Sequence, residues 1–179
     1  MIMCGLESLK IDLKGLKEGE KVLEYDLDDA YFRAVDGPEI SKGRVHVSLA
    51  IRRQSGFFEL LFHTDGTVII PCDRCLEEME QPVRADNRLT VKLGAAYSED
   101  DDLVTIDADE GILDVSWFIY EFIALAIPIR HVHEPGKCSA AMIEALEEHS
   151  AARSSDEEEP EAIDPRWEAL RKLRDESEG

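Results

Sequence analysis

The stretch "GRVHVSLAIRRQSGFFELLFHTDGTVIIPC", residues 43–72, carries the clearest fold signal in the sequence. Its first half alternates strictly, and the apolar members of the alternation are Val45, Val47, Leu49 and Ile51. A half-buried β-strand has this two-residue period, because successive side chains point to opposite faces. Ser-Gly at 55–56 then predicts a turn, and Asp-Gly at 65–66 predicts a second hairpin before Cys72. The stretch therefore predicts antiparallel strands.

Further strands are predicted on both sides of this stretch. Residues 9–16 and 21–27 alternate apolar and polar side chains around "KEGE", which predicts two short strands joined by a turn. Residues 84–94 alternate in the same way, and "LVTID" at 103–107 predicts a last short strand. The first hundred residues are thus predicted to form a mostly antiparallel sheet.

An apolar segment with helical character follows the strands. Asp114 can cap a helix over about 115–127, and Pro128 ends it. Its side chains are apolar nearly all round, so we expect burial against the sheet, with Glu121 paired to an arginine. Residues 138–150 predict a second, amphipathic helix. The predicted fold class is α+β: a curled, mostly antiparallel, split-barrel-like sheet with one buried helix and short C-terminal helices.

Composition divides the chain into a domain and a tail. We expect one α+β domain over residues 1–149. Residues 150–162 are acidic and lack bulky apolar side chains, so they are predicted to form a disordered linker. Residues 163–179 are predicted to form an amphipathic helix, with Asp164 as N-cap and Pro165 at the first helical position. The apolar stripe of this helix is a predicted partner-binding surface and consists of Trp167, Leu170 and Leu173.

Charge and hydropathy exclude several functional classes. Acidic residues outnumber basic ones by 40 to 20, and the net charge of -20 repels phosphate backbones, so a nonspecific nucleic-acid binder is not expected. The N-terminus lacks the apolar core of an export signal, and the longest apolar run is shorter than a membrane-spanning helix. We therefore expect a cytoplasmic protein with no membrane contact. In that compartment cysteines are thiols, metal ligands or catalytic groups rather than structural disulfides.

The cysteines and histidines form two groups that could share one metal ion. Cys72 and Cys75 form a C-x-x-C pair after a predicted strand, where a tight turn brings both sulfurs to the same side. Nearly sixty residues later, "HVHEPGKC" supplies His131, His133 and Cys138. Three thiolates and one imidazole form a tetrahedral set that is common in structural zinc sites.

Two other interpretations of the cysteines stay open. In one, Cys72, Cys75 and Cys138 are small buried side chains and the histidines are surface groups. In the other, the C-x-x-C pair is redox-active. A thioredoxin-like pair opens a sizeable helix, however, whereas the chain here reaches Pro82 within about two helical turns. The sequence also lacks a phosphate-binding glycine loop, a nucleophile elbow and an H-E-x-x-H motif, so no pattern indicates an enzyme.

Three segments carry a family resemblance: "CDRCLEEM" at 72–79, "DVSWFIYEFIALAIPIRHVHEPGKC" at 114–138 and "DPRWEALRKL" at 164–173. In order and separation they resemble the YceD family, also called large ribosomal RNA subunit accumulation proteins. The resemblance places His133 where relatives have His or Cys, an exchange that a zinc ligand tolerates, and it leaves His131 as a bystander. It thereby implies a structural zinc site formed by Cys72, Cys75, His133 and Cys138.

The resemblance also implies a function. The family is implicated in the accumulation of large-subunit ribosomal RNA, and its genes often neighbour that of a small zinc-ribbon protein of the large subunit. We therefore expect a non-enzymatic ribosome-biogenesis factor that binds a ribosomal protein or a pre-ribosomal particle, because an acidic protein attracts basic ones. One alternative is a metal-binding or redox-active cysteine protein unrelated to ribosomes. Another is a direct RNA binder, which requires a local basic patch.

Overall fold

The structure is a computed structural model that describes residues 6–16, 19–100 and 103–149. The described residues up to Ile143 belong to one compact unit. Its elements, in chain order, are η1 (Leu6–Leu9), β1 (Lys10–Asp12), β2 (Glu20–Leu27), α1 (Asp29–Val35), β3 (Lys42–Arg53), β4 (Phe58–Pro71), β5 (Glu78–Gly94), β6 (Ser98–Asp100), β7 (Leu103–Asp107), β8 (Ile112–Asp114) and α2 (Ser116–Leu125). A further helix, α3, spans Ala140–Glu148 and buries no residue.

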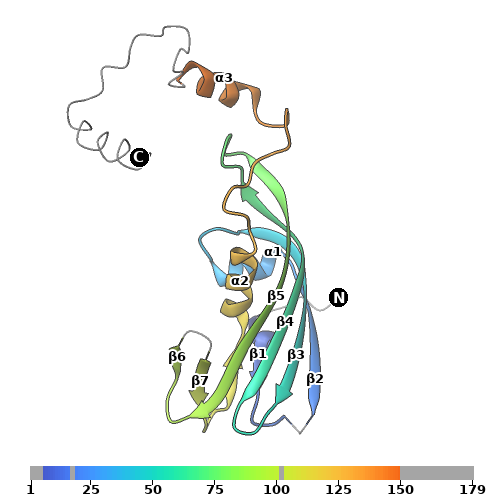
Figure 1. Ribbon diagram of the computed structural model, residues 1–179, viewed down its shortest axis with the longest axis vertical. Coiled ribbons are helices and arrows are strands. Elements are labelled where there is room, and N and C mark those ends of the chain that lie inside the picture. The colour runs from blue at the N-terminus through green and yellow to red at the C-terminus, as the bar shows by residue number, and fades with distance from the viewer. Residues whose placement is uncertain (1–5, 17–18, 101–102, 150–179) are drawn as a thin grey trace, which may run out of the picture. The chain divides into compact units, whose positions relative to one another are not determined.

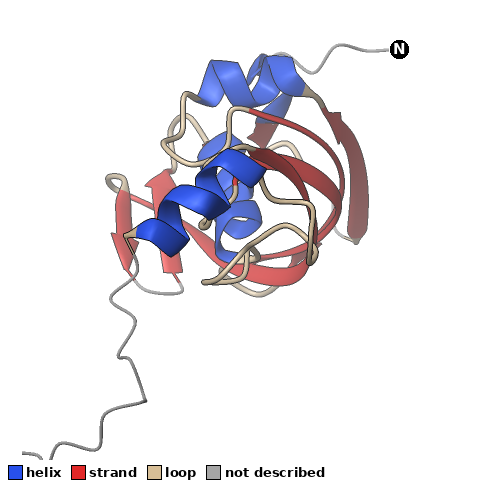
Figure 2. Cartoon of the chain, turned by 90° about the horizontal axis from the view of Figure 1, so that it is seen from above, coloured by secondary structure: helices blue, strands red, loops and turns tan. Residues whose placement is uncertain are grey.

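The main sheet has six strands in the order β2-β3-β4-β5-β7-β6. Every neighbouring pair is antiparallel except β5 and β7, which run parallel. Figure 1 shows β2 to β5 as long, twisted strands lying side by side. Seen from above, the sheet is a curved wall with open edges (Figure 2). The predicted fold class, an α+β protein with a curled and mostly antiparallel sheet, is confirmed, and the sheet is not a closed barrel.

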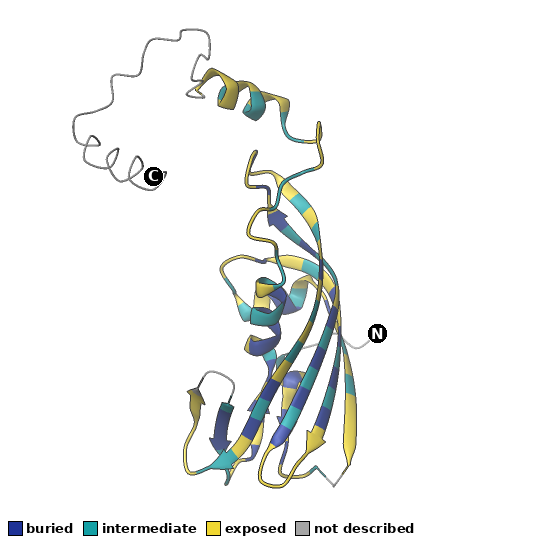
Figure 3. Ribbon diagram, in the orientation of Figure 1, coloured by how far each residue is buried: buried dark blue, intermediate teal, exposed yellow. Residues whose placement is uncertain are grey.

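The predicted alternation of β3 is confirmed by its burial. Its four apolar residues are all 1 % exposed or less, and the residues between them face outward (Figure 3). On the outer face, His46 lies between Asp26 and Glu24, with 2.8 Å from a ring nitrogen to each carboxylate. The hydrogen bond to Asp26 raises the pKa of His46 above its usual value, against the opposing effect of burial. His46 is therefore a surface group within an ion-pair ladder.

The predicted hairpin at Asp65 and Gly66 is wrong. Strand β4 runs without interruption from Phe58 to Pro71, and Gly66 lies in its middle, opposite Val45 of β3. A Cβ atom at Gly66 would lie 2.3 Å from the carbonyl oxygen of Arg44. The glycine is thus required by the close approach of the neighbouring backbone and not by a turn.

The predicted pairing of the first two strands is also wrong. β1 pairs with β8 in a separate two-stranded sheet, while β2 pairs with β3 at the edge of the main sheet. Between β2 and β3 lies α1, a helix that the sequence analysis missed. Asp28 caps α1, because its carboxylate accepts hydrogen bonds from the backbone N–H groups of Ala30 and Tyr31.

Helix α2 confirms the predicted buried helix in position, but only one of its faces is covered. Phe118, Ile119, Tyr120 and Ile123 are buried. The expected burial against the sheet is thus confirmed for this face, whereas the outer side chains Trp117 and Leu125 are 47 % and 80 % exposed although they are apolar.

The polar groups of α2 fix its position. The hydroxyl of Tyr120 accepts hydrogen bonds from the backbone N–H groups of Glu39 and Ile40, at 2.9 and 3.2 Å. The partner of Glu121 is the indole N–H of Trp117, at 2.7 Å, and not the arginine that we expected.

None of the described helices is long and apolar enough to cross a membrane.

Three predictions fall outside the described residues and stay predictions. They are the acidic linker at 150–162, the helix at 163–179, and the partner-binding stripe of Trp167, Leu170 and Leu173.

Candidate metal centre

The C-x-x-C pair forms the tip of the hairpin between the two longest strands. The ladder of β4 and β5 ends at the pair Pro71 and Glu78, and residues 72–77 turn the chain between them. The turn is closed by hydrogen bonds from the N–H of Leu76 to the carbonyl of Cys72, and from the N–H of Cys72 to the carbonyl of Glu77, both 2.9 Å. The sulfurs of Cys72 and Cys75 lie within 4.8 Å of each other, so both are on the same side of the turn, as the spacing predicted. A strand follows this turn, so the pair does not open a helix as a thioredoxin-like pair does.

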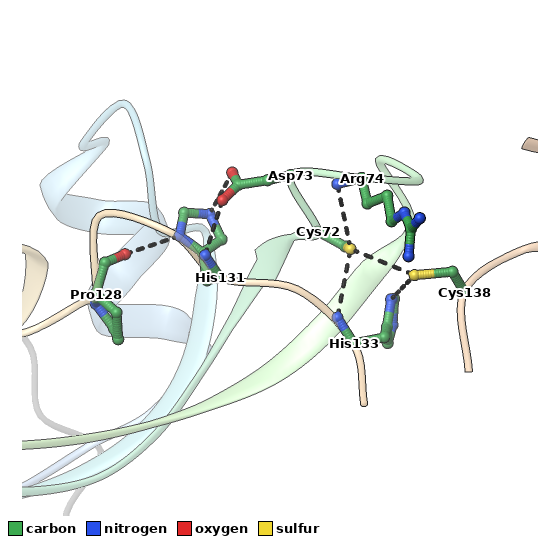
Figure 4. A network of polar contacts seen from close by, with 7 residues as sticks. All are labelled: Cys72, Asp73, Arg74, Pro128, His131, His133 and Cys138. Carbon is green, nitrogen blue, oxygen red and sulfur yellow. Dashed lines mark hydrogen bonds and ion pairs between the residues drawn. The ribbon is translucent and has the colours of Figure 1, made fainter. Parts of the chain in front are cut away.

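A clamp of hydrogen bonds holds the second ligand segment against this turn. The N–H of Asp73 donates to the carbonyl of His131 at 3.0 Å, and the N–H of His131 donates to the carboxylate of Asp73 at 2.7 Å. The ring of His131 lies between the Asp73 carboxylate, 3.2 Å from Nε2, and the carbonyl of Pro128, 3.0 Å from Nδ1 (Figure 4). The clamp joins segments that are 58 residues apart in the chain.

Beyond the clamp, His133 and Cys138 bring the last two donor atoms to the cysteine pair. The four donor atoms of Cys72, Cys75, His133 and Cys138 all lie within 4.8 Å of one another. The sulfurs of Cys72 and Cys138 are 4.0 Å apart. Nδ1 of His133 lies 3.3 Å from the sulfur of Cys75 and 4.0 Å from that of Cys138.

These separations fit one tetrahedral ion. With metal–sulfur bonds of about 2.3 Å and a metal–nitrogen bond of about 2.0 Å, ideal edges are roughly 3.8 Å between two sulfurs and roughly 3.5 Å between sulfur and nitrogen. The three separations given individually, 4.0, 3.3 and 4.0 Å, lie within about 0.5 Å of these values, and no separation exceeds 4.8 Å. The four side chains could therefore hold a metal ion with small adjustments, and all four coordination positions would be taken by the protein.

The electrostatics of the thiols are suited to a cation. Burial alone would raise the pKa of the Cys72 thiol, but hydrogen bonds from the backbone N–H groups of Arg74, Cys75 and His133 and from the thiol of Cys75 lower it to about 6. Two of these donors lie 3.4 Å from the sulfur. For Cys138, burial and the neighbouring sulfurs of Cys72 and Cys75 raise the pKa to about 11. Adjacent thiolates repel one another, so ionisation of the whole cluster requires a positive ion among them.

The four residues predicted as ligands are therefore the four that converge, and His131 lies outside the donor set. Its role in the clamp was missed. The only signal in the sequence was the acidic Asp73 directly after Cys72, and nothing local indicated that the two residues would meet.

Leu76 holds the turn in an unusual backbone conformation, and this leads to a prediction. The φ angle of Leu76 is +62°, in the left-handed region. Its side chain is 70 % exposed, so few packing contacts are lost when it is removed. Residues with a Cβ atom occupy this region at a cost of about 1–2 kcal/mol. Leu76→Gly should therefore raise the free energy of unfolding by about 1 kcal/mol, as measured by chemical denaturation. Leu76→Ala removes the side chain and keeps the strain, so an equal gain in that control would refute the explanation.

The fold and the site together define a class: a small α+β protein with a cluster of three cysteines and one histidine at the tip of a long hairpin. The family model described as "Large ribosomal RNA subunit accumulation protein YceD" matches residues 60–174. The chain therefore belongs to the YceD family. A search of curated proteins and a search of solved structures found no match.

Proposed function

We propose that this protein is a cytoplasmic, non-enzymatic factor that supports the accumulation of large-subunit ribosomal RNA by binding a ribosomal protein, free or within a pre-ribosomal particle. The observation that carries the proposal is the family match over residues 60–174, whose description names large ribosomal RNA subunit accumulation. The residues that could bind a metal support a binding role. A metal held by four protein side chains has no open position for a substrate, which is typical of structural centres.

Charge explains how such a factor would select its partner. With 40 acidic and 20 basic residues, the chain carries a net charge of -20. This field attracts the basic surfaces of ribosomal proteins, speeds their encounter and screens them from RNA until delivery. We propose that the acidic residues 150–162 and the stripe of Trp167, Leu170 and Leu173 take part in this binding.

We also propose that the metal is zinc and that its role is structural. Three thiolates and one imidazole are donors that zinc prefers, and structural zinc sites are almost always tetrahedral, with four donors such as those gathered here. The ion would fasten the hairpin tip to the segment after α2. The competing hypothesis, a redox-active cysteine pair, needs an accessible thiolate. Cys72 has a lowered pKa but is 0 % exposed, and Cys75 is 3 % exposed, so burial argues against that hypothesis.

Affinity purification tests the proposed function. The tagged full-length chain should enrich large-subunit ribosomal proteins at physiological salt, relative to an unrelated acidic protein of similar size and charge. Enrichment should fall in about 1 M salt, where the Debye length is about 3 Å. If no ribosomal protein is enriched over the acidic control, the proposed function is wrong. Steeply salt-dependent binding of purified RNA without protein would favour a direct RNA binder instead.

A further inference from the structure

Beside the candidate metal centre lies an apolar groove of about 840 Å³. It is formed by the outer face of α2, the segment from Ile127 to His131, the end of β4 and residues 38–39. Three of the nine large apolar side chains that are exposed in the described residues line it: Trp117, Leu125 and Ile129, at 47 %, 80 % and 103 % exposure. Apolar side chains gathered in this way on a surface mark interaction sites.

Trp117 is held in place although nearly half of it faces solvent. Its ring stacks on Tyr120, with centroids 5.3 Å apart and planes inclined by 25°. Its indole N–H donates to the carboxylate of Glu121 at 2.7 Å. The ring therefore loses little freedom when a partner covers it, a property of residues that dominate binding energy. Its exposed face is also suited to a lysine or arginine side chain.

The charged side chains of the groove indicate that its partner carries positive charge. The charged side chains that line it are Glu39 and Glu121, and the described lining contains no lysine or arginine. Arg130 is the nearest cation in sequence but is not part of the lining. A second copy of this chain is a poor occupant, because two molecules with a net charge of -20 repel each other. A segment that pairs an apolar anchor with lysine or arginine matches both the apolar lining and the two carboxylates.

The groove is also connected to the candidate metal centre. Pro128 lines it and accepts a hydrogen bond from the ring of His131, whose backbone is clamped to Asp73 beside Cys72 (Figure 4). This wall of the groove thus depends on the segment that carries His133 and Cys138.

We infer that this groove binds a basic segment of a partner protein, with an apolar side chain against Trp117, Leu125 and Ile129 and flanking cations near Glu39 and Glu121. The inference rests on the proposed function and specifies the surface and the chemistry of the partner segment. It names a surface other than the predicted stripe at 167–173.

A labelled synthetic peptide tests the groove on the full-length protein. The probe is a twelve-residue peptide with two leucines flanked by lysines and arginines, and binding is followed by fluorescence anisotropy. Leu125→Ser combined with Ile129→Ser should weaken binding at least about tenfold, because both side chains are exposed anchors that do not support the core. Val22→Ser, an exposed apolar residue outside the groove lining, is the matched control and should leave binding unchanged.

Charge is tested in the same assay. Glu39→Gln should weaken binding several-fold, whereas Glu110→Gln, an exposed acid outside the lining, should not. Equal effects of groove and control variants would overturn the inference, as would undiminished binding of a peptide with serines in place of both leucines. A dimer that Ile129→Ser converts to monomer, or tighter binding of a peptide copying residues 163–179, would overturn it as well, since the occupant would then be this chain.

Affinity purification separates the failure of this inference from the failure of the proposed function. If the groove double variant enriches ribosomal proteins as well as the wild type does, the groove inference fails and the proposed function stands. If the wild type enriches none over the acidic control, the proposed function itself fails.

Discussion

Replacing Cys138 by serine should raise the dissociation constant for zinc at least about 100-fold and reduce the bound zinc to a small fraction of one ion per chain. Cys138 supplies one of the four donor atoms, and a serine hydroxyl at neutral pH is no substitute for a thiolate. The zinc-depleted variant should also unfold at lower temperature than the zinc-loaded wild type, because the proposed role of the metal is to fasten the hairpin tip to the segment after α2. Elemental analysis and thermal unfolding measure the two effects.

Two further variants show whether Cys138→Ser loses zinc because a ligand of the metal has been removed. His133→Cys exchanges the imidazole for a thiolate and should keep about one zinc per chain. His131→Asn removes the ring of the clamp but no donor atom, so zinc should remain bound, with affinity lowered by no more than roughly 10- to 100-fold. If Cys138→Ser binds as much zinc as the wild type, or if chelated wild type keeps the stability of the loaded form, the metal centre is refuted.

Replacing Gly66 by alanine should lower the free energy of unfolding by about 3 kcal/mol. The new Cβ would lie 2.3 Å from the carbonyl oxygen of Arg44 and 2.6 Å from Cα of Val45. Both are backbone atoms of β3, which must move apart from β4 to admit it. The smaller conformational entropy of an alanine in the unfolded chain returns only about 0.4–1 kcal/mol. Denaturant titration of the variant gives the difference.

Gly94→Ala is the matched control. Gly94 is also a strand residue of the main sheet, where it ends β5 and pairs with Asp107 of β7. Its added Cβ would lie 2.4 Å from the Cγ2 methyl of Thr105, a side-chain atom that can move by rotation. We expect a change within about 1 kcal/mol there. Similar losses at Gly66 and Gly94 would contradict the explanation that strand backbones approach unusually closely at Gly66.

Gly66 also shows what the sequence could and could not reveal about the fold. The strands themselves were predictable, since the burial of one face enforces the alternation seen at Val45 to Ile51. Asp65-Gly66 has the local sequence of a hairpin turn. The glycine is needed, however, because the backbone of the neighbouring strand β3 leaves no room for a Cβ atom. In the same way, β1 pairs with β8 about a hundred residues away, and β5 pairs with β7 in parallel. Such partners are set by packing across the fold and leave no local signal.

The candidate site likewise has one part that the sequence predicted and another that it did not. The residue types and the C-x-x-C spacing indicated Cys72, Cys75 and Cys138 together with one of two histidines, because thiolates and imidazole are the usual donors of a tetrahedral metal site. The choice of His133 over His131 came from the family resemblance. Their convergence depends on the clamp between Asp73 and His131, which local patterns did not indicate. The groove was missed for a related reason. Helix α2 is apolar nearly all round, and only its neighbours decide that Tyr120 is covered while Trp117 and Leu125 are not.

The arrangement of the four donor atoms is tested most directly by X-ray absorption at the zinc edge, measured on the purified full-length chain. We expect about one zinc per chain, with three sulfur neighbours at about 2.3 Å and one nitrogen neighbour at about 2.0 Å. That result would establish that residues 72–75 and 133–138 form a single centre. A zinc ion surrounded by oxygen and nitrogen alone, or a folded chain that takes up no zinc when it is supplied, would contradict the account.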